Sequence, residues 1–322
     1  MTRYSSLSVD LDNHWSYLKT HGNPAWERFP SYLDRVVPLV CEFAEELDIG
    51  LTMFVVGQDA ELGKNAGAMA MIGESGHEVA NHSFHHEPWL HLKSHAEIEE
   101  EIGRAHRAIE QATGKASAGF RGPGFSISQD TMRVLDSHGY SYDASTLPTF
   151  IGPLARAFYM RGSGLDDDEL KQRSQLFGSV KEVLRPNGPY LWRFSDGDAG
   201  PVEVPVTTMP LFRVPIHATY LLYIAKYSPA LSGAYLRSAL ALCRLTGTMP
   251  SILLHSLDFI GAEDITDLGF FPGMDMSGEV KRGLLKDYAS ALLDFGTIVP
   301  VGEHATLAAA TKLKKANVSS LA

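Results

Sequence analysis

The stretch LTMFVVG at residues 51–57 decides the fold class, because it is a short apolar run followed directly by a glycine. Such a run is typical of a strand that is buried on both faces, as in a parallel sheet covered by helices. Before it, residues 32–47 carry apolar side chains at helical spacing, and residues 5–9 predict another strand. This strand–helix–strand order indicates an α/β architecture.

The alternation continues along the chain. Further strands are predicted at residues 78–81, 118–120, 140–143, 202–206, 251–254 and 297–301, and helices at residues 94–113, 130–138, 220–245 and 280–295. Residues 150–200 are rich in Gly, Pro and charge, which indicates an insertion on the scaffold. We therefore predict one domain over residues 1–305 that includes this insertion, and a frayed C-terminal tail over residues 306–322.

The composition narrows the range of functions. The chain has 322 residues and a formal net charge of −10, so it lacks the basic surface of a nucleic-acid-binding protein. It has only two cysteines, Cys41 and Cys243, which favours a reducing compartment over a disulfide framework. The first residues, MTRYSSLSVDLD, lack the apolar core of a signal peptide, and we therefore expect a cytoplasmic protein.

Polar side chains follow five of the predicted strands at the point where each strand ends. They are Asp10 and Asp12, His82 and His86, Arg121, Asp143, and His255. The carboxyl ends of parallel strands converge on one face of a barrel. The sequence therefore predicts that these side chains meet at one site.

Four of these residues predict a metal site. His82 and His86 are four residues apart, so one helical turn would place both imidazoles on one side. Asp10 and Asp12 alternate along a strand and so share a face, where two carboxylates repel unless a cation lies beside them. One Asp would then bind the metal and the other would act as a base. The alternatives are a solvated histidine cluster and a strand end that caps the next helix.

The remaining strand-end residues suit acid–base chemistry. Arg121 can pair with a carboxylate and keep it ionised, and the glycines of RGPGF (residues 121–125) let a backbone N–H approach a developing oxyanion. A carboxylate such as Asp143 can orient an imidazole, so His255 is a candidate general acid for a leaving amine.

These motifs resemble those of the polysaccharide deacetylase family, which is also called carbohydrate esterase family 4 and contains the NodB-homology domain. Residues 8–12 (SVDLD) are similar to its first motif in the Asp-x-Asp form of a subgroup, and HSFHH at residues 82–86 fits His-Ser/Thr-x-x-His. RGP at residues 121–123 resembles Arg-x-Pro, Asp143 is the candidate for the fourth motif, and ILLH at residues 252–255 resembles Leu-x-x-His.

The resemblance implies an irregular (β/α) barrel of about seven strands and a divalent metal, with zinc expected and cobalt, iron, manganese or nickel as alternatives. It implies roles for the strand-end residues: Asp12, His82 and His86 as metal ligands, Asp10 as a base kept ionised by Arg121, His255 as an acid oriented by Asp143, and the Gly124 N–H as an oxyanion donor.

The implied reaction is removal of an N-acyl group, expected to be acetyl, from an amino sugar or a sugar-containing substrate, for which a lipid- or nucleotide-linked form is one alternative. His14, Trp15 and Phe125 are the predicted substrate contacts, since aromatic side chains can stack on sugars. Residues 215–245 are expected to pack on the barrel; otherwise they would lie on the inner face of a membrane. The competing hypotheses are an allantoinase-like hydrolase of ring amides, a 2-His-1-carboxylate Fe(II) redox enzyme, and a non-catalytic metal- or lipid-binding protein.

Overall fold

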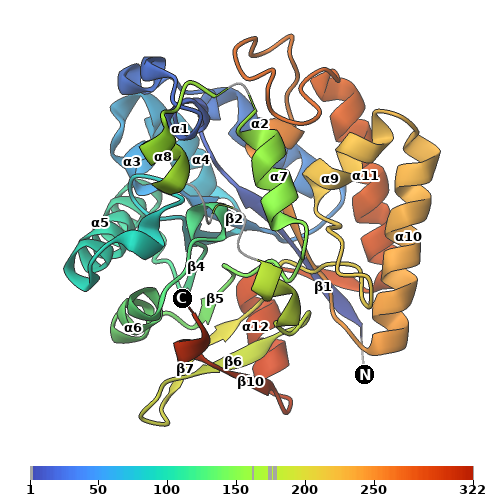
Figure 1. The fold of residues 1–322 in the computed structure, drawn as a ribbon. Helices are drawn as coiled ribbons and strands as arrows, with labels where there is room; N and C mark the ends of the chain where they lie inside the picture. Colours follow the sequence, from blue (N-terminus) through green and yellow to red (C-terminus); the bar gives the residue numbers. More distant parts are fainter. Residues whose placement is uncertain (1–2, 162, 173–175, 177–179, 322) are drawn as a thin grey trace.

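Helices surround a single sheet in the computed structural model, which describes residues 3–161, 163–172, 176 and 180–321 (Figure 1). The strands are β1 (Tyr4–Asp10), β2 (Thr52–Val55), β3 (Glu78–Asn81), β4 (Gly119–Phe120), β5 (Tyr142–Asp143), β6 (Tyr190–Arg193), β7 (Ala199–Glu203), β8 (Ser251–His255), β9 (Thr297–Val299) and β10 (Lys314–Asn317). The α-helices are α1 (His14–Thr20), α2 (Leu33–Glu46), α3 (Gly57–Glu61), α4 (Ala66–Glu74), α5 (His95–Thr113), α6 (Gln129–Ser137), α7 (Gly152–Tyr159), α8 (Asp167–Gln172), α9 (Ala218–Ala225), α10 (Pro229–Thr246), α11 (Gly278–Phe295) and α12 (Val301–Ala309).

The sheet has the order β10-β6-β7-β5-β4-β3-β2-β1-β8, and β9 pairs with β1 beside this path. In the described part of the chain, β6 and β7 form the antiparallel pair and the other pairs are parallel. The predicted α/β fold with a mostly parallel sheet is confirmed, and it is consistent with a distorted barrel.

The register of the sheet brings the strand ends to one level. Asp10, the last residue of β1, lies opposite Phe54 of β2 on one side and opposite His255 of β8 on the other. Asn81 at the end of β3 lies opposite Val55 and Phe120, so His82 and Arg121 leave the sheet together. Parallel pairing therefore places the predicted site residues at one end of the sheet.

The chain after β7 links the two sides of the sheet. The Val206 N–H donates to the Thr146 carbonyl at 2.9 Å, and the Thr207 N–H donates to the Ser251 carbonyl at 2.9 Å. Ser251 begins β8, and Thr146 follows β5. These bonds connect the residues after β5 with the start of β8.

The prediction of a frayed tail is wrong. The predicted boundary at residue 306 lies inside α12, and β10 then pairs in parallel with β6, from within the predicted insertion. Val318 and Leu321 are buried in an apolar cluster with Trp192. The free edge of β6 and these two apolar side chains hold the last residues on the barrel, which the Ala- and Lys-rich composition did not reveal.

The helical stretch predicted at residues 220–245 is divided into α9 and α10. Pro229 is the first residue of α10, where its missing N–H costs no helical hydrogen bond, and Ser228 caps the helix by accepting from the Leu231 N–H at 3.2 Å. Among the described residues, no helix has the length and apolarity that crossing a bilayer requires.

Burial of His304 in α12 makes the fold sensitive to acid. The side chain is 0% exposed, and its Nδ1 lies 2.9 Å from the Ser6 hydroxyl. Burial lowers the pKa of His304 from 6.5 to about 3. Between these values the unfolded chain binds the proton and the folded chain does not, so the free energy of unfolding falls as the pH drops below about 6.5.

We therefore expect the His304 contribution to fall by about 1.4 kcal/mol between pH 7.5 and pH 5.5. Urea unfolding of the unsubstituted protein and of His304→Leu at both pH values measures this difference. The leucine variant should lose about 1.4 kcal/mol less stability over the interval. An equal loss in the two proteins would show that His304 is not the source.

Candidate metal centre

The loop after β3 carries His82 and His86, and it is not helical as the spacing predicted. Ser83 and His86 have left-handed backbone conformations, with φ of 62° and 49°. The Ser83 carbonyl accepts from the Gly57 N–H at 2.9 Å, so the loop bonds to the start of α3 instead of to itself. The predicted helical turn is wrong, because tertiary hydrogen bonds replace the helical ones, but both imidazoles still reach the same point.

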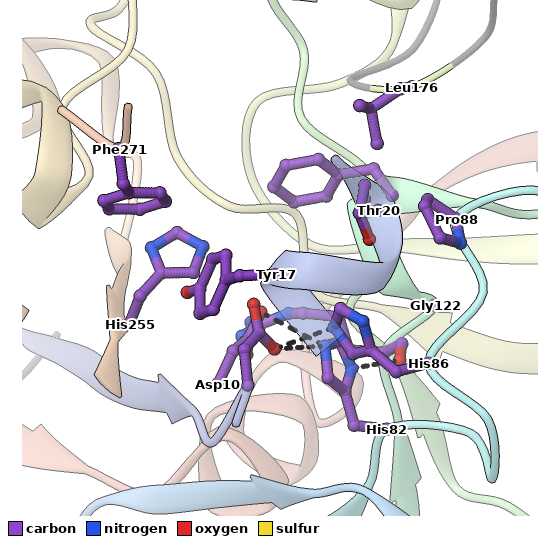
Figure 2. Close-up of a pocket in the computed structure, with 14 residues that line it drawn as sticks. Asp10, Tyr17, Thr20, His82, His86, Pro88, Gly122, Leu176, His255 and Phe271 are labelled. Atoms are coloured by element: carbon purple, nitrogen blue, oxygen red, sulfur yellow. Dashed lines mark hydrogen bonds and ion pairs between the residues drawn. The ribbon is translucent and has the colours of Figure 1, made fainter. Parts of the chain in front are cut away.

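Asp12, His82 and His86 form a buried cluster (Figure 2). The Asp12 Oδ1 atom lies 2.9 Å from His86 Nε2 and 3.2 Å from His82 Nε2. The three candidate ligand atoms lie within 4.8 Å of one another. Two imidazole nitrogens and one carboxylate oxygen are donors that suit a divalent transition metal, so the cluster is a candidate metal site.

The proton positions in the cluster support this assignment. His82 Nδ1 donates to the Arg121 carbonyl at 2.6 Å, so in the neutral ring Nε2 carries a lone pair. That lone pair faces the Asp12 Oδ1 lone pairs at 3.2 Å, which is repulsive unless a proton or a cation lies between them. The hydrogen bond to the Arg121 carbonyl thus orients His82, as hydrogen bonds to the second ring nitrogen orient histidine ligands in metal sites.

The charges in the cluster are strongly coupled. Burial alone would raise the pKa of Asp12, but His86 and His82 hold it well below its usual value. Burial alone would lower the pKa of His82, but Asp10 and Asp12 raise it. Both shifts mean that the carboxylates require positive charge at this point, whether from protons or from a metal.

Asp10 is a second carboxylate beside the cluster, and it is paired as predicted. Arg121 Nη1 donates to Asp10 Oδ1 at 2.6 Å and to the Ser8 hydroxyl at 3.0 Å. The other oxygen, Oδ2, lies 3.7 Å from His82 Nε2. Arg121 is only 1% exposed, and its guanidinium lies 4.1 Å from the ring centroid of Phe54. The carboxylate is therefore held rigidly by a buried guanidinium.

The cluster opens into a cavity of about 60 Å³. Its wall includes the predicted residues Asp10, Asp12, His82, His86, Arg121, Gly124, Phe125 and His255. It also includes Gly122 of the RGPGF motif, and residues that the motifs did not indicate: Tyr17, Thr20, Pro88, Leu176 and Phe271. Figure 2 shows His82 and His86 together, with His255 and Phe271 at the other side. Tyr17 and Thr20 lie three residues apart on α1, directly after Asp12, so helical spacing could have found them.

Two of the three predicted substrate contacts lie elsewhere. Trp15 is 1% exposed and donates from Nε1 to Asp59 at 2.9 Å, so it is a core residue. His14 lies 2.8 Å from the exposed Asp267 and is absent from the wall of the cavity. Helix α1 explains both positions, since consecutive residues on a helix point in different directions. Its residues that face the cavity are Tyr17 and Thr20. Phe125 does line the cavity.

Asp143 is buried and does not orient His255 as predicted. It accepts from the Ser145 hydroxyl at 2.6 Å, and the Ser145 Oγ atom accepts from the Gly122 N–H at 2.8 Å. Asp143 therefore supports the loop that carries Arg121. It also lies beside Glu203, whose pKa burial and the Asp143 charge raise well above the usual value. Asp143, at the end of β5, is absent from the wall of the cavity, and the sequence of this short strand does not reveal that.

The structure pairs His255 with Thr219 and Asp258 instead. The Thr219 hydroxyl lies 2.9 Å from His255 Nδ1 and 2.9 Å from Asp258 Oδ1. Asp258 Oδ2 accepts from the His255 backbone N–H at 2.8 Å. Asp258 follows its histidine by three residues, so HSLD at residues 255–258 was a local signal that the sequence analysis missed.

Comparisons with known proteins agree with this geometry. The family model for polysaccharide deacetylase matches residues 26–142. That range contains His82, His86 and Arg121, whereas the placement of Asp10, Asp12 and His255 rests on the structure.

The chain is similar to a peptidoglycan deacetylase of Helicobacter pylori, with 28% identity over 163 residues, which are 48% of this chain and 52% of that protein. It thus spans about half the length of the curated relative it matches. The fold resembles the crystal structure of a candidate polysaccharide deacetylase from Mycobacterium smegmatis, with a TM-score of 0.63, 18% identity, and coverage of 98% of this chain and 92% of that one. With its Asp–His–His cluster at the carboxyl end of a parallel sheet and this match over residues 26–142, the chain is similar to the polysaccharide deacetylase family, carbohydrate esterase family 4.

Proposed function

We propose that the chain is a metal-dependent amide hydrolase that removes an N-acyl group, preferably acetyl, from an amino sugar or a substrate that contains one. One observation carries the proposal: Asp10, held by Arg121 at 2.6 Å, lies beside the three-residue cluster on the wall of the same cavity. In a purely structural metal site, protein ligands fill every coordination position, and no further carboxylate is needed beside them.

Asp12, His82 and His86 would hold the metal, and we propose zinc because its usual ligands are of these kinds. When bound, such an ion lowers the pKa of water toward neutrality and polarises a carbonyl oxygen. Metal analysis of the purified protein distinguishes zinc from cobalt, iron, manganese and nickel.

The side chains of the cavity supply the proton transfers. Asp10 accepts a proton from the attacking water, and the Arg121 guanidinium fixes the orientation of its carboxylate. His255, across the cavity, donates a proton to the departing nitrogen. The proton is required because an amine anion is too poor a leaving group to depart unprotonated. The backbone N–H of Gly124 is the proposed donor to the developing oxyanion.

The size of the cavity supports a small acyl group. A volume of about 60 Å³ has room for only a few water molecules. Pro88, Leu176 and Phe271 give part of the wall an apolar character that suits a methyl group. The sugar, and any group linked to it, would then lie outside the cavity at its open mouth.

Release of acetate from N-acetylated amino sugars, free, oligomeric, nucleotide-linked and lipid-linked, tests the proposal. Asp10→Asn should keep the metal and lower kcat by about 10² to 10⁴, because the amide cannot accept the proton. Asp130→Asn, an exposed carboxylate that contacts His95, is the control and should keep full activity. Cleavage of ureides without acetate release would instead assign an allantoinase-like reaction, and full activity of Asp10→Asn would contradict the mechanism.

A further inference from the structure

The hydroxyl of Thr219 bridges the ring of His255 and the carboxylate of Asp258. Its Oγ1 atom lies 2.9 Å from His255 Nδ1, and 2.9 Å and 3.2 Å from the two Asp258 oxygens. Thr219 is the second residue of α9, whereas His255 ends β8 and Asp258 lies in the 3-10 turn that follows. Thr219 and Asp258 are 6% and 1% exposed, so water does not compete for these bonds.

The acceptor of the single hydroxyl proton of Thr219 can be assigned from the neighbouring groups. The Asp258 carboxylate already accepts from the His255 backbone N–H at 2.8 Å. Burial raises the pKa of Asp258, but His255 and Lys281 oppose this shift. Lys281 is buried beside this turn, and its Nζ donates to the carbonyls of Leu257 and Ile260 at 2.9 Å and 2.8 Å. An ionised carboxylate only accepts, so the Thr219 O–H donates to Asp258 and its oxygen accepts from His255 Nδ1–H.

The other ring nitrogen of His255 is left for chemistry. Within the described residues, no hydrogen bond to His255 Nε2 is formed, and His255 lies on the wall of the cavity. A ring that keeps its proton on Nδ1 can gain and lose a second proton only at Nε2.

We propose that Thr219 is a positioning residue that fixes the Nδ1–H form of His255 and thereby directs proton donation from Nε2 into the cavity. This inference rests on the proposed function. The oxygen of the attacking water forms a bond to the acyl carbon, the C–N bond of the substrate breaks with its electron pair on nitrogen, and that nitrogen takes the Nε2 proton. His255 is left neutral with Nδ1–H still bound to Thr219, and Asp10 holds the proton from water.

Kinetics of Thr219→Val and Thr219→Ser test the proposal. Valine keeps the shape and removes the hydroxyl, so kcat should fall about 10- to 100-fold with little change in KM, a part of the usual effect of a general acid. Serine keeps the hydroxyl and should stay within about threefold of the unsubstituted enzyme. Thr306→Val removes an exposed helical hydroxyl and should have no effect. Equal losses for valine and serine, or no loss for valine, would overturn the proposal.

A second measurement does not depend on activity. ¹⁵N chemical shifts of histidine-labelled protein, with His255 assigned by the signals missing in His255→Gln, report which ring nitrogen carries the proton. Neutral His255 should be protonated at Nδ1, and Thr219→Val should shift the population toward Nε2–H. An Nε2–H tautomer in the unsubstituted protein would refute the role of Thr219. Inactivity of the unsubstituted protein toward every substrate, with the Nδ1–H tautomer present, would instead refute only the proposed function.

Discussion

Asp12→Asn is expected to lose metal binding while the fold remains intact. Asp12 supplies the only carboxylate oxygen of the cluster, at 2.9 Å from His86 Nε2 and 3.2 Å from His82 Nε2. An amide of the same shape brings no negative charge, so two neutral imidazoles must hold the cation alone. Loss of a residue that only hydrogen-bonds to a metal ligand already weakens metal affinity by about 10- to 100-fold. Loss of a ligand itself should weaken the affinity more.

Metal content after dialysis and a competition titration with a chelator measure the effect. The control is Asp267→Asn, because Asp267 also lies 2.8 Å from a histidine, His14, but at an exposed position outside the cluster. The control should bind metal as the unsubstituted protein does. If Asp12→Asn kept stoichiometric metal with unchanged affinity, the assignment of the site would have to be withdrawn.

Arg121→Met is expected to cost about 3 to 5 kcal/mol of folding free energy as well as activity. Both partners are buried, with Arg121 at 1% and Asp10 at 4% exposure. Removing the guanidinium leaves the buried Asp10 charge without its partner, and it also removes the hydrogen bonds to the Ser8 hydroxyl and the Ala144 carbonyl. Urea unfolding in the absence of metal measures the loss of stability.

Two further variants isolate the cause. Arg104→Met breaks the exposed pair with Glu61, whose side chains are 40% and 41% exposed, and should cost at most about 1 kcal/mol. The double variant Arg121→Met with Asp10→Asn removes both charges and should recover part of the stability lost by Arg121→Met. If no stability is recovered, Arg121 contributes to the free energy of unfolding through its packing on Phe54 and not through its charge.

The local pattern of the chain determined most of the elements. Helix α5 lies within one residue of the predicted range, 94–113, because the signals that bound it, the Ser94 cap and Gly114, act within a few residues. The strands β1, β2, β3 and β8 were predicted within one or two residues because buried parallel strands are short apolar runs. Asp12, His82 and His86 were predicted to meet because each follows such a strand.

Only the tertiary structure decided what surrounds these residues. The sequence indicated Asp143 as the partner of His255, but the structure gives Thr219 and Asp258, because α9 packs against the end of β8. In the structure, Trp15 also lies in the core, and the C-terminal strand β10 pairs with β6. Such contacts join segments that are far apart in the chain, and no local periodicity encodes them. Chain pattern thus set which residues end the strands, whereas long-range packing set which neighbours orient them.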